Sequence, residues 1–484
     1  MDDPQSDPEA LFRLLPSVDE LLRGSGLSAL VEKYPRAVLV QAARSILGSV
    51  RKDIAAGAHT QKSVLEVVYA MGDRVALEAQ RSLSPTLVAV INATGVVLHT
   101  NLGRAPLSEA AIRTIVDVAS GYSNLEFDLQ SGNRGRRDRH AGPMLLRALG
   151  SIVGEPAEQI GERWDVAIVN NCAAATLLGL NSLAEGGEVL VSRGELVEIG
   201  GGFRIPEILK KAGVHLREVG TTNRTRLSDY AGAINANTRM ILRVHQSNFR
   251  MQGFTERVEL EDLVELGRSS GIFVFEDQGT GLMVSLDDLG VHGEPSLAES
   301  FRKAPDLIAA SGDKLLGGPQ CGILLGKSAV VERVRANPLF RALRVDKLTY
   351  AALEATLLSY ITHKEDEIPT VRMLRVPASE LHRRCLAVRD AVATKDLEAI
   401  VVSTQSVIGG GTMAGSTLDS FAVSLRHELH TASALLAELR RQSPPLIARV
   451  QNDCVLLDLR AVPPAQDEVV IGIVRAVAPR EWKR

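Results

Sequence analysis

Seven short apolar runs alternate with segments of helical spacing through the middle of the chain, and this alternation limits the possible folds more than any other feature. The runs are Asp165–Val169, Glu188–Ser192, Val214–Val219, Met240–Val244, Ile272–Glu276, Leu307–Ala309 and Gly322–Leu325. Short apolar runs that alternate with helices are typical of a mostly parallel sheet covered by helices. We therefore predict an α/β fold that binds its ligand at the carboxyl ends of the strands.

The regions on either side of these runs have different patterns. Before about residue 80, apolar residues recur at helical spacing, and basic residues outnumber acidic ones between Lys33 and Arg81. After about Pro369 the pattern is mixed, with expected strands at Val401–Val407 and Val455–Asp458, an expected helix at Leu435–Leu439 and an expected turn at Gly409–Gly411.

A chain of 484 residues is long enough for about three domains. We expect an N-terminal helical domain at residues 1–75, a core domain at residues 76–368 and a small C-terminal α+β domain at residues 369–484. The basic surplus in the first of these has an ordinary explanation as a solvated helical face, and by itself it is weak evidence for RNA binding.

The composition excludes several classes of protein. The net charge of −3 gives no overall attraction to nucleic acid, so any RNA surface must be local. The four cysteines form no CxxC pair, which argues against a disulfide framework and against a zinc site, and we expect no metal. The first residues lack a signal-peptide pattern, and no apolar run is long enough to cross a bilayer. We expect a soluble protein of the reducing cytoplasm.

Lys314 is the first candidate for chemistry. It ends the sequence Ser311-Gly312-Asp313-Lys314, directly after the apolar run at Leu307–Ala309. A lysine crowded by small residues loses solvation of its charged form and becomes a nucleophile for an aldehyde. Ser311 could bind a cofactor phosphate, and Asp313 is the second predicted catalytic residue. An isolated lysine of this kind is usually a surface residue, so the interpretation depends on the neighbouring strand ends.

Three other strand ends carry complementary groups. The run Phe273–Asp277 ends in a carboxylate, which could hold a pyridinium N–H⁺, although an aspartate there could also cap a helix. The small residues after Val169 begin a helix, whose free N–H groups form an anion site. The polar residues after Val244 suit a ring hydroxyl. The predicted cofactor contacts are Lys314, Asp277, Ser311, Asn171, Cys172, Ala173, Ser247 and Asn248.

The order of these four elements along the chain is a phosphate site, a ring-contact loop, an acidic residue and a lysine. This order on a parallel sheet resembles the aspartate-aminotransferase-like (type I) fold of enzymes that use pyridoxal 5′-phosphate (PLP). The resemblance implies PLP as the cofactor, carried as a Schiff base on Lys314, with Asp277 at the ring nitrogen.

Several longer motifs resemble a narrower family, the bacterial selenocysteine synthases, or L-seryl-tRNA(Sec) selenium transferases. The motifs are Ile91–Val97, Asn101–Leu107, Tyr122–Asp128, Ser192–Gly200 and Ser311–Gly322. The resemblance covers nearly the whole chain, from the N-terminal helices to the glycine turn near residue 410. Such motifs are far more specific than a single glycine-rich loop.

The family resemblance implies a reaction. L-Seryl-tRNA(Sec) forms an imine with PLP, Lys314 removes the Cα proton, and loss of the hydroxyl gives dehydroalanyl-tRNA, to which selenium from selenophosphate adds. The resemblance further implies that residues 1–75 bind the tRNA, and that the chain forms a homo-oligomer built from dimers, commonly a decamer. A lysine base and an electron-poor ring suit the proton abstraction, but the residues alone do not indicate selenium.

Three arginines match family residues thought to line the active site, and the resemblance implies that they bind selenophosphate: Arg104, Arg341 and Arg344. Arg341 and Arg344 are three residues apart, so we expect them to share one face of a helix. Without the resemblance, a solvated helix face is the better explanation. The basic segment Asn133–His140 could contact tRNA phosphate or pair with acidic residues, and the two interpretations have equal support.

Two other functions stay open at this point. One is a related PLP-dependent lyase or transferase that acts on a free amino acid or an amino sugar, which would have no need of a basic helical domain. The other is a non-catalytic RNA-binding protein on a degenerate PLP fold. The presence of both Asp277 and Lys314 argues against the second alternative.

Overall fold

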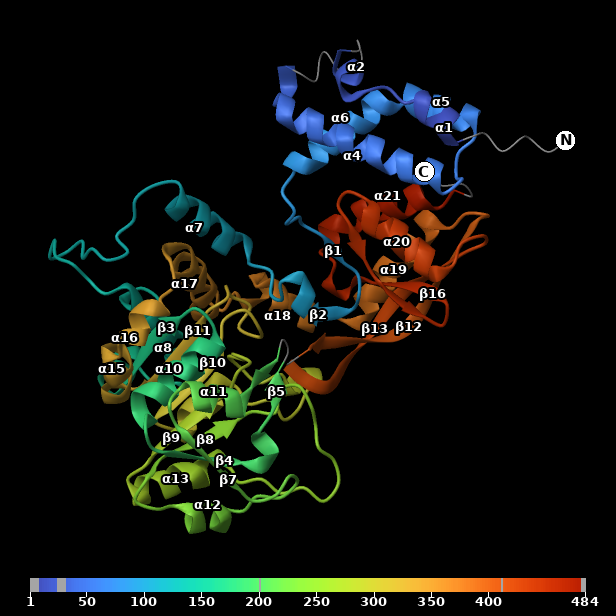
Figure 1. The fold of residues 1–484 in the computed structure, drawn as a ribbon. Helices are drawn as coiled ribbons and strands as arrows, with labels where there is room; N and C mark the ends of the chain where they lie inside the picture. The colour runs from blue at the N-terminus through green and yellow to red at the C-terminus, as the bar shows by residue number, and fades with distance from the viewer. Residues whose placement is uncertain (1–7, 24–31, 200–201, 411, 480–484) are drawn as a thin grey trace. The chain divides into compact units, whose positions relative to one another are not determined.

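The computed structural model describes residues 8–23, 32–199, 202–410 and 412–479 (Figure 1). The chain divides into two compact units, Met1–Ala89 and Val90–Arg484. No helix within the described ranges is long and apolar enough to span a lipid bilayer.

The first unit is helical in the part described. Its helices are α1 (Pro8–Arg13), α2 (Val18–Arg23), α4 (Arg36–Ala55), α5 (Gln61–Tyr69) and α6 (Met71–Leu83). Leu39 and Leu47, on one face of α4, belong to the same buried cluster as Val64 of α5 and Val75 of α6, so each amphipathic helix buries its apolar stripe against the others. The expected domain boundary after residue 75 falls inside α6, and the compact unit continues to Ala89.

A seven-stranded sheet forms the centre of the second unit, with the order β3-β11-β10-β9-β8-β4-β7. Neighbouring strands are parallel except where β11 pairs with β3 and β10. All seven predicted runs are strands of this sheet. Their bounds are β3 (Trp164–Val169), β4 (Glu188–Ser192), β7 (His215–Val219), β8 (Thr238–Val244), β9 (Phe273–Asp277), β10 (Leu307–Ser311) and β11 (Gly322–Lys327).

Helices cover both faces of this sheet (Figure 1). Along β10, Ile308 packs in the cluster that contains Leu149 of α8, whereas the next residue, Ala309, packs in the cluster that contains Leu178 of α10. Successive strand residues point to opposite faces, so a strand buried on both faces reads as a continuous apolar run. The helices of this region are α7 (Glu109–Ala119), α8 (Gly142–Val153), α9 (Ala157–Arg163), α10 (Cys172–Ala184), α11 (Ile205–Lys211), α12 (Leu227–Ala233), α13 (Leu260–Ser270), α14 (Leu297–Lys303), α15 (Ser328–Ala336), α16 (Pro338–Ala342) and α17 (Lys347–Ile361).

A second sheet, with the order β15-β16-β13-β12-β2, lies in the C-terminal part of this unit. The segment just after residue 90 joins that part, because β1 (Ile91–Asn92) pairs with β14 (Leu446–Ile447) and β2 (Val96–Leu98) pairs with β12. Of the expected glycine turn, Gly409 ends β12, and Gly411 lies outside the described residues. The other elements are β12 (Leu397–Gly409), β13 (Thr412–His427), β15 (Arg449–Gln451), β16 (Cys454–Asp458), α18 (Pro369–Arg375), α19 (Ala378–Val392), α20 (Ala432–Arg441) and α21 (Asp467–Val477), with the small pair β5 (Glu198–Ile199) and β6 (Phe203–Arg204) in the core part.

Candidate active site

Asp277 is the buried acid at the carboxyl end of β9. The Thr176 hydroxyl donates to its Oδ2 at 3.1 Å, and the Cys172 thiol lies 3.5 Å from its Oδ1. Burial raises the pKa of Asp277 above its ordinary value of 3.8, because desolvation outweighs these hydrogen bonds and the attraction of Lys314. A cationic ligand group beside this carboxylate would offset the cost of burying its charge.

The turn from β3 into α10 holds Asn171, Cys172 and Ala173, the residues predicted to contact the cofactor phosphate. Asn171 caps the helix, because its side chain accepts a hydrogen bond from the Ala174 amide at 2.9 Å. The first amides of the helix, at Cys172 and Ala173, have no acceptor within the helix itself. Since Cys172 and Thr176 also contact Asp277, the first turn of α10 connects these amides to the Asp277 carboxylate.

Lys314 is buried in the turn that follows β10, with 8% of its surface exposed. Close backbone packing holds this turn. A Cβ at Gly281 would lie 2.2 Å from the Ser311 carbonyl oxygen, and one at Gly312 would lie 2.5 Å from Sγ of Cys321. Because β9 and β10 are adjacent and parallel, Asp277 and Lys314 follow neighbouring strands at the same edge of the sheet.

Asp313 has both carboxylate oxygens engaged. The Ser311 hydroxyl donates to Oδ1 at 2.7 Å, and Arg104 Nη1 donates to Oδ2 at 2.9 Å. Arg104 has a backbone φ of 61°, which costs a non-glycine residue free energy and is common at functional sites. Thus Ser311 and Arg104, predicted to contact two different phosphates, both bind Asp313 in this structure.

His245 is the first residue of the segment after β8, whose polar residues are predicted to suit a ring hydroxyl. The backbone amide of His245 donates to the Asp277 carbonyl at 3.0 Å, and the His245 ring lies 3.0 Å from Glu294. The two residues predicted there, Ser247 and Asn248, lie further along. Ser247 is buried, and Asn248 donates to the Glu198 carbonyl while its own Oδ1 is buried without a partner among the described residues.

Arg341 and Arg344 do not share a helix face, so that expectation is wrong. Helix α16 ends at Ala342, and Arg344 forms an isolated antiparallel bridge with Val169 at the end of β3. The helix starts at Pro338, and after Ala342 the chain pairs with the end of β3 instead of continuing as a helix. Both arginines still line one cavity of about 400 Å³, which contains neither Arg104 nor Lys314. Arg104 lines a separate cavity of about 800 Å³.

The basic segment Asn133–His140 pairs with acidic residues. Arg134 and Arg137 both contact Glu126, Arg139 contacts Asp128, and Arg136 lies 3.5 Å from Glu332. The Arg137–Glu126 pair is partly buried, and the other three pairs have exposed arginines and contribute little stability each. They favour the second of the two interpretations of this segment, although Arg134, Arg136 and Arg137 also line the cavity with Arg341 and Arg344.

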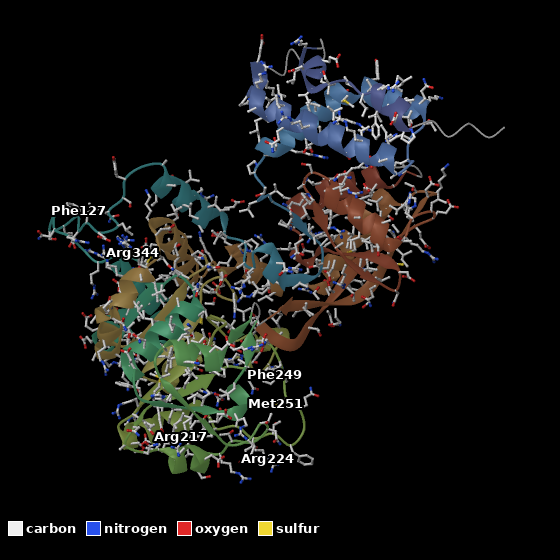
Figure 2. All side chains as sticks on the ribbon, in the orientation of Figure 1. Phe127, Arg217, Arg224, Phe249, Met251 and Arg344 are labelled. Carbon is white, nitrogen blue, oxygen red and sulfur yellow. The ribbon has the colours of Figure 1, made fainter. Side chains whose placement is uncertain are left out.

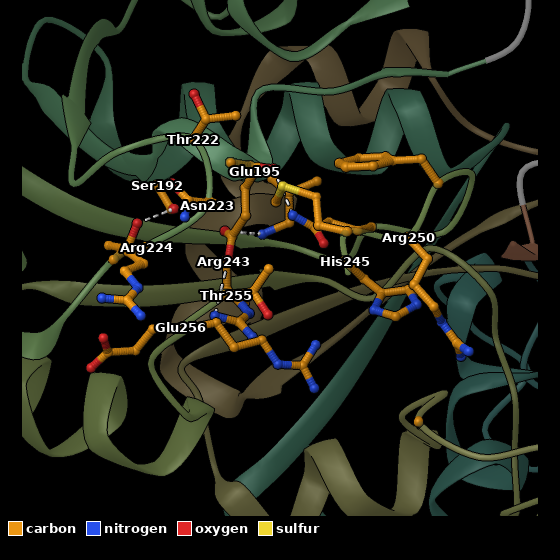
Figure 3. A pocket seen from close by; sticks show the side chains of 18 of the residues that line it. Ser192, Glu195, Thr222, Asn223, Arg224, Arg243, His245, Arg250, Thr255 and Glu256 are labelled. Carbon is orange, nitrogen blue, oxygen red and sulfur yellow. Dashed lines mark hydrogen bonds and ion pairs between the residues drawn. The ribbon is translucent and has the colours of Figure 1, made fainter. Parts of the chain in front are cut away.

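A further cavity of about 340 Å³ lies beside His245 at the ends of β4, β7 and β8 (Figure 3). Glu195 and Arg243 form a buried ion pair in it, with 3.0 Å between Nη1 and Oε1. Arg224 and Arg250 lie on either side of this pair in Figure 3. The sequence analysis did not predict this cavity. Its walls come from the loops after three strands that are far apart in the chain, and no local pattern connects them.

Comparisons with known proteins agree with the sequence resemblance. A family model described as L-seryl-tRNA selenium transferase matches residues 90–463, and one described as the N-terminal part of selenocysteine synthase matches residues 12–51. The L-seryl-tRNA(Sec) selenium transferase of Aquifex aeolicus (strain VF5) is 41% identical over 458 residues, which is 94% of this chain and 96% of that protein. The one from Moorella thermoacetica is 42% identical over 477 residues, 96% of this chain and 97% of that protein.

Among solved structures, D-glucosaminate-6-phosphate ammonia-lyase is similar, with a TM-score of 0.54 and 18% identity over 81% of this chain and 96% of that one. A likeness at this identity concerns the fold alone. The predicted aspartate-aminotransferase-like α/β fold with an N-terminal helical region is confirmed.

Proposed function

The chain belongs to the L-seryl-tRNA selenium transferase family, and we propose that it converts L-seryl-tRNA(Sec) to L-selenocysteinyl-tRNA(Sec) with selenophosphate as the selenium donor. The observation that carries the proposal is the pairing of a buried acid and a buried lysine, Asp277 and Lys314, at the ends of adjacent parallel strands. A tRNA-binding protein without catalytic function would have no need of this pair.

The residues at these strand ends fit PLP. Asp277 is a buried carboxyl group whose pKa is raised by desolvation, and a cation beside it, such as a pyridinium N–H⁺, would offset that desolvation. The amides of Cys172 and Ala173 begin a helix and suit a phosphate. Lys314 supplies the amine for a carbonyl. When bound, PLP supplies an electron sink that stabilises negative charge at the substrate Cα.

We assign the chain's own residues the following roles. Lys314 removes the proton from the Cα of the seryl group and holds it for transfer to the departing hydroxyl. Asp277 keeps the ring nitrogen protonated, and Thr176 orients Asp277 through its 3.1 Å hydrogen bond. Asp313 positions Arg104 beside Lys314, since its carboxylate binds the guanidinium at 2.9 Å. Ser247 and Asn248 stay proposed cofactor contacts, as do Asn171 and Ser311.

We further propose that Arg104, Arg341 and Arg344 bind selenophosphate. Guanidinium groups bind phosphate oxygens through charge-assisted hydrogen bonds. Within one chain Arg104 lines a different cavity from the other two. A donor site that uses all three therefore favours a homo-oligomer built from dimers, for which the family resemblance implies a decamer.

The first unit, Met1–Ala89, is the proposed tRNA-binding part, because it carries the local basic surplus and lies before every cofactor residue. We place the reaction in the cytoplasm, where aminoacyl-tRNA is made and used. The test is to incubate the purified protein with PLP, seryl-tRNA(Sec) and selenophosphate, and to identify the aminoacyl product by mass spectrometry. Release of unchanged seryl-tRNA, or conversion of a free amino acid instead, would contradict the proposal.

A further inference from the structure

The cavity beside His245 has a charge that its own residues do not balance. Of its three carboxylates, Glu195 pairs with Arg243 at 3.0 Å, Glu294 with His245 at 3.0 Å, and Glu256 with Arg226 at 3.3 Å. Three further arginines line the cavity and form no ion pair with any residue that the structure describes: Arg224, Arg250 and Arg257.

Arg224 and Arg250 contact carbonyls and not carboxylates, whereas the charge of Arg257 acts partly on Glu195. Arg224 donates from Nε to the Phe254 carbonyl at 3.4 Å, and Arg250 donates from Nη2 to the His292 carbonyl at 3.3 Å. A carbonyl orients a guanidinium without neutralising it. All three arginines are exposed, and the cavity is open to anions.

Two aromatic side chains lie in the same loop as Arg250 and Arg257: Phe249, which lines the cavity, and Phe254, which precedes the lining residue Thr255. Phe254 has 84% of its surface exposed and Phe249 has 36%. Phe249 and Met251 both line this cavity, and Figure 2 labels them apart from Arg344, which lines another one. Arginines interleaved with exposed aromatic rings are the combination that binds single-stranded nucleic acid, through phosphate contacts and base stacking.

The backbone holds Phe254 in this exposed position. The turn that carries it is hydrogen-bonded to the segment after β7, where the Asn223 side chain donates to the Phe254 carbonyl at 2.6 Å. The Thr225 amide donates to Glu256 at 3.0 Å, and the Glu256 amide donates to Asn223 at 2.9 Å. These hydrogen bonds fix the turn, so the exposed Phe254 ring is held next to the cavity that Asn223 and Glu256 line.

The cavity also lies beside the proposed chemistry. His245 lines it, and the His245 amide binds the Asp277 carbonyl. The seryl group of the proposed substrate is esterified to the terminal ribose of the tRNA, so the nucleotides before that ribose must lie next to the reaction centre. The cavity is in the right place to hold them.

We propose that this cavity binds the single-stranded 3′ end of the tRNA, with Arg250 and Arg257 contacting phosphates and Phe254, which directly precedes the lining residue Thr255, stacking on a base beside the cavity. This inference rests on the proposed function and assigns residues to its substrate. Recognition there depends on stacking and on charge, so it is tolerant of base identity, and specificity for the tRNA must come from elsewhere in the complex.

The experiment measures the KM for seryl-tRNA(Sec) and for selenophosphate separately in the full-length holoenzyme. Phe254→Leu keeps the apolar bulk but removes the ring, and should raise the KM for seryl-tRNA roughly tenfold. Phe254→Tyr keeps the ring and should stay near wild type. Neither variant should change the KM for selenophosphate. Arg268→Gln, an exposed arginine of α13 outside the cavity, is the control.

A second readout does not depend on turnover. A labelled single-stranded RNA of about eight nucleotides should bind the wild-type holoenzyme, with the salt dependence expected of phosphate contacts. Arg250→Gln and Arg257→Gln should each lower the slope of log K against log salt by about 0.7. Binding that is equal in these variants, in Phe254→Leu and in Arg268→Gln would overturn the inference.

The outcomes separate this inference from the proposed function. If the wild type makes no selenocysteinyl-tRNA but binds the RNA through Phe254 and the arginines, the proposed function fails and the RNA site stands. If it makes the product while Phe254→Leu keeps both KM values, the RNA site is refuted. A Phe254→Leu enzyme with a smaller oligomeric mass and an equal rise in both KM values would identify the loop as a contact between subunits, which also overturns the inference.

Discussion

Arg104 donates a hydrogen bond from Nη1 to Oδ2 of Asp313 at 2.9 Å, although the two residues lie 209 positions apart in the chain. The Asp313 side chain is 8% exposed and the Arg104 side chain 34%. The pair therefore joins the segment before α7 to the turn that holds Lys314. Because the Ser311 hydroxyl occupies the other carboxylate oxygen, Asp313 acts through its neighbours, which makes it a positioning residue in this geometry.

The Arg104–Asp313 pair predicts non-additive effects on catalysis. Asp313→Asn should lower kcat and raise the KM for selenophosphate, because the guanidinium loses its charged anchor. Arg104→Ala should have a similar effect, and the double variant should be little worse than either single one, as expected for residues that act as a unit. Steady-state kinetics of all four proteins test this. Effects that multiply in the double variant would mean that the two residues act independently.

Lys314→Ala should remove the covalent attachment of the cofactor. In the wild type, borohydride reduction should fix PLP on the peptide that contains Lys314, and mass spectrometry should find it there. Lys327→Ala is a matched control, since Lys327 is a half-exposed lysine at the end of the next strand and pairs with Asp306 at 2.7 Å. Labelling of another lysine in the wild type would show that the cofactor assignment is wrong.

Asp277→Asn should have opposite effects on stability in the apoprotein and in the PLP-bound protein. The folded-state pKa of Asp277 is raised above 3.8, so the folded apoprotein binds this proton more tightly than the unfolded chain does. The contribution of Asp277 to stability is therefore full below the unfolded value and is lost as the pH rises through the folded value. At neutral pH the Asn variant should melt no lower than wild type without PLP.

With PLP bound, the order should reverse. The pyridinium would place a positive charge beside the Asp277 carboxylate. The wild type should therefore gain more in Tm from PLP than the Asn variant does. The measurement is the Tm of both proteins with and without PLP, from below pH 3.8 to neutral pH. An equal gain from PLP in the two proteins would contradict the role of Asp277 at the ring nitrogen.

The central sheet could be predicted because its strands are buried on both faces. Runs such as Val166–Val169 and Leu307–Ala310 are continuous and apolar, and glycines or polar residues flank them. The polar residue that ends each strand then lies at the ligand edge by topology alone. For this reason Asp277 and Lys314 follow adjacent strands, as the sequence pattern implied.

The contacts between segments far apart in the chain could not be predicted in the same way. The sequence spacing of Arg341 and Arg344 suggested a helix face, but pairing of Arg344 with Val169 outweighs helix propensity after Ala342. Thr176 could have been found, since it lies one helical turn after Cys172 on the face that meets Asp277. No local pattern relates Arg104 to Asp313, and only the folded chain brings them together.

Removal of residues 1–89 should spare the cofactor and weaken the binding of tRNA. Val90–Arg484 is a compact unit with buried clusters of its own, so it should fold with its PLP site intact. If the basic surplus contacts phosphates, the truncated protein should also show a flatter dependence of tRNA affinity on salt. Gel-shift or anisotropy titrations at several salt concentrations test this. Unchanged affinity and slope would exclude the first unit as a tRNA-binding part.

Arg341→Ala and Arg344→Ala should weaken the binding of selenophosphate and leave the binding of seryl-tRNA unchanged. Both residues line the cavity of about 400 Å³, and Arg344 is only loosely paired, with 4.0 Å between its Nη1 and Glu126. A charge-assisted hydrogen bond to phosphate contributes about 1.5–3 kcal/mol, so each variant should raise the KM for selenophosphate by roughly tenfold or more. The KM for seryl-tRNA and the cofactor absorbance should not change.

The control for these two variants is Arg333→Ala, because Arg333 lies on the neighbouring helix α15 and does not line that cavity. Arg335 would be a poor control, since its buried guanidinium pairs with both Asp138 and Asp165 and its loss would leave those carboxylates without a partner. If both donor variants keep the control's KM for selenophosphate, these arginines belong to a solvated surface. If instead they raise the KM for seryl-tRNA alone, the cavity serves the tRNA, and the donor must bind through Arg104.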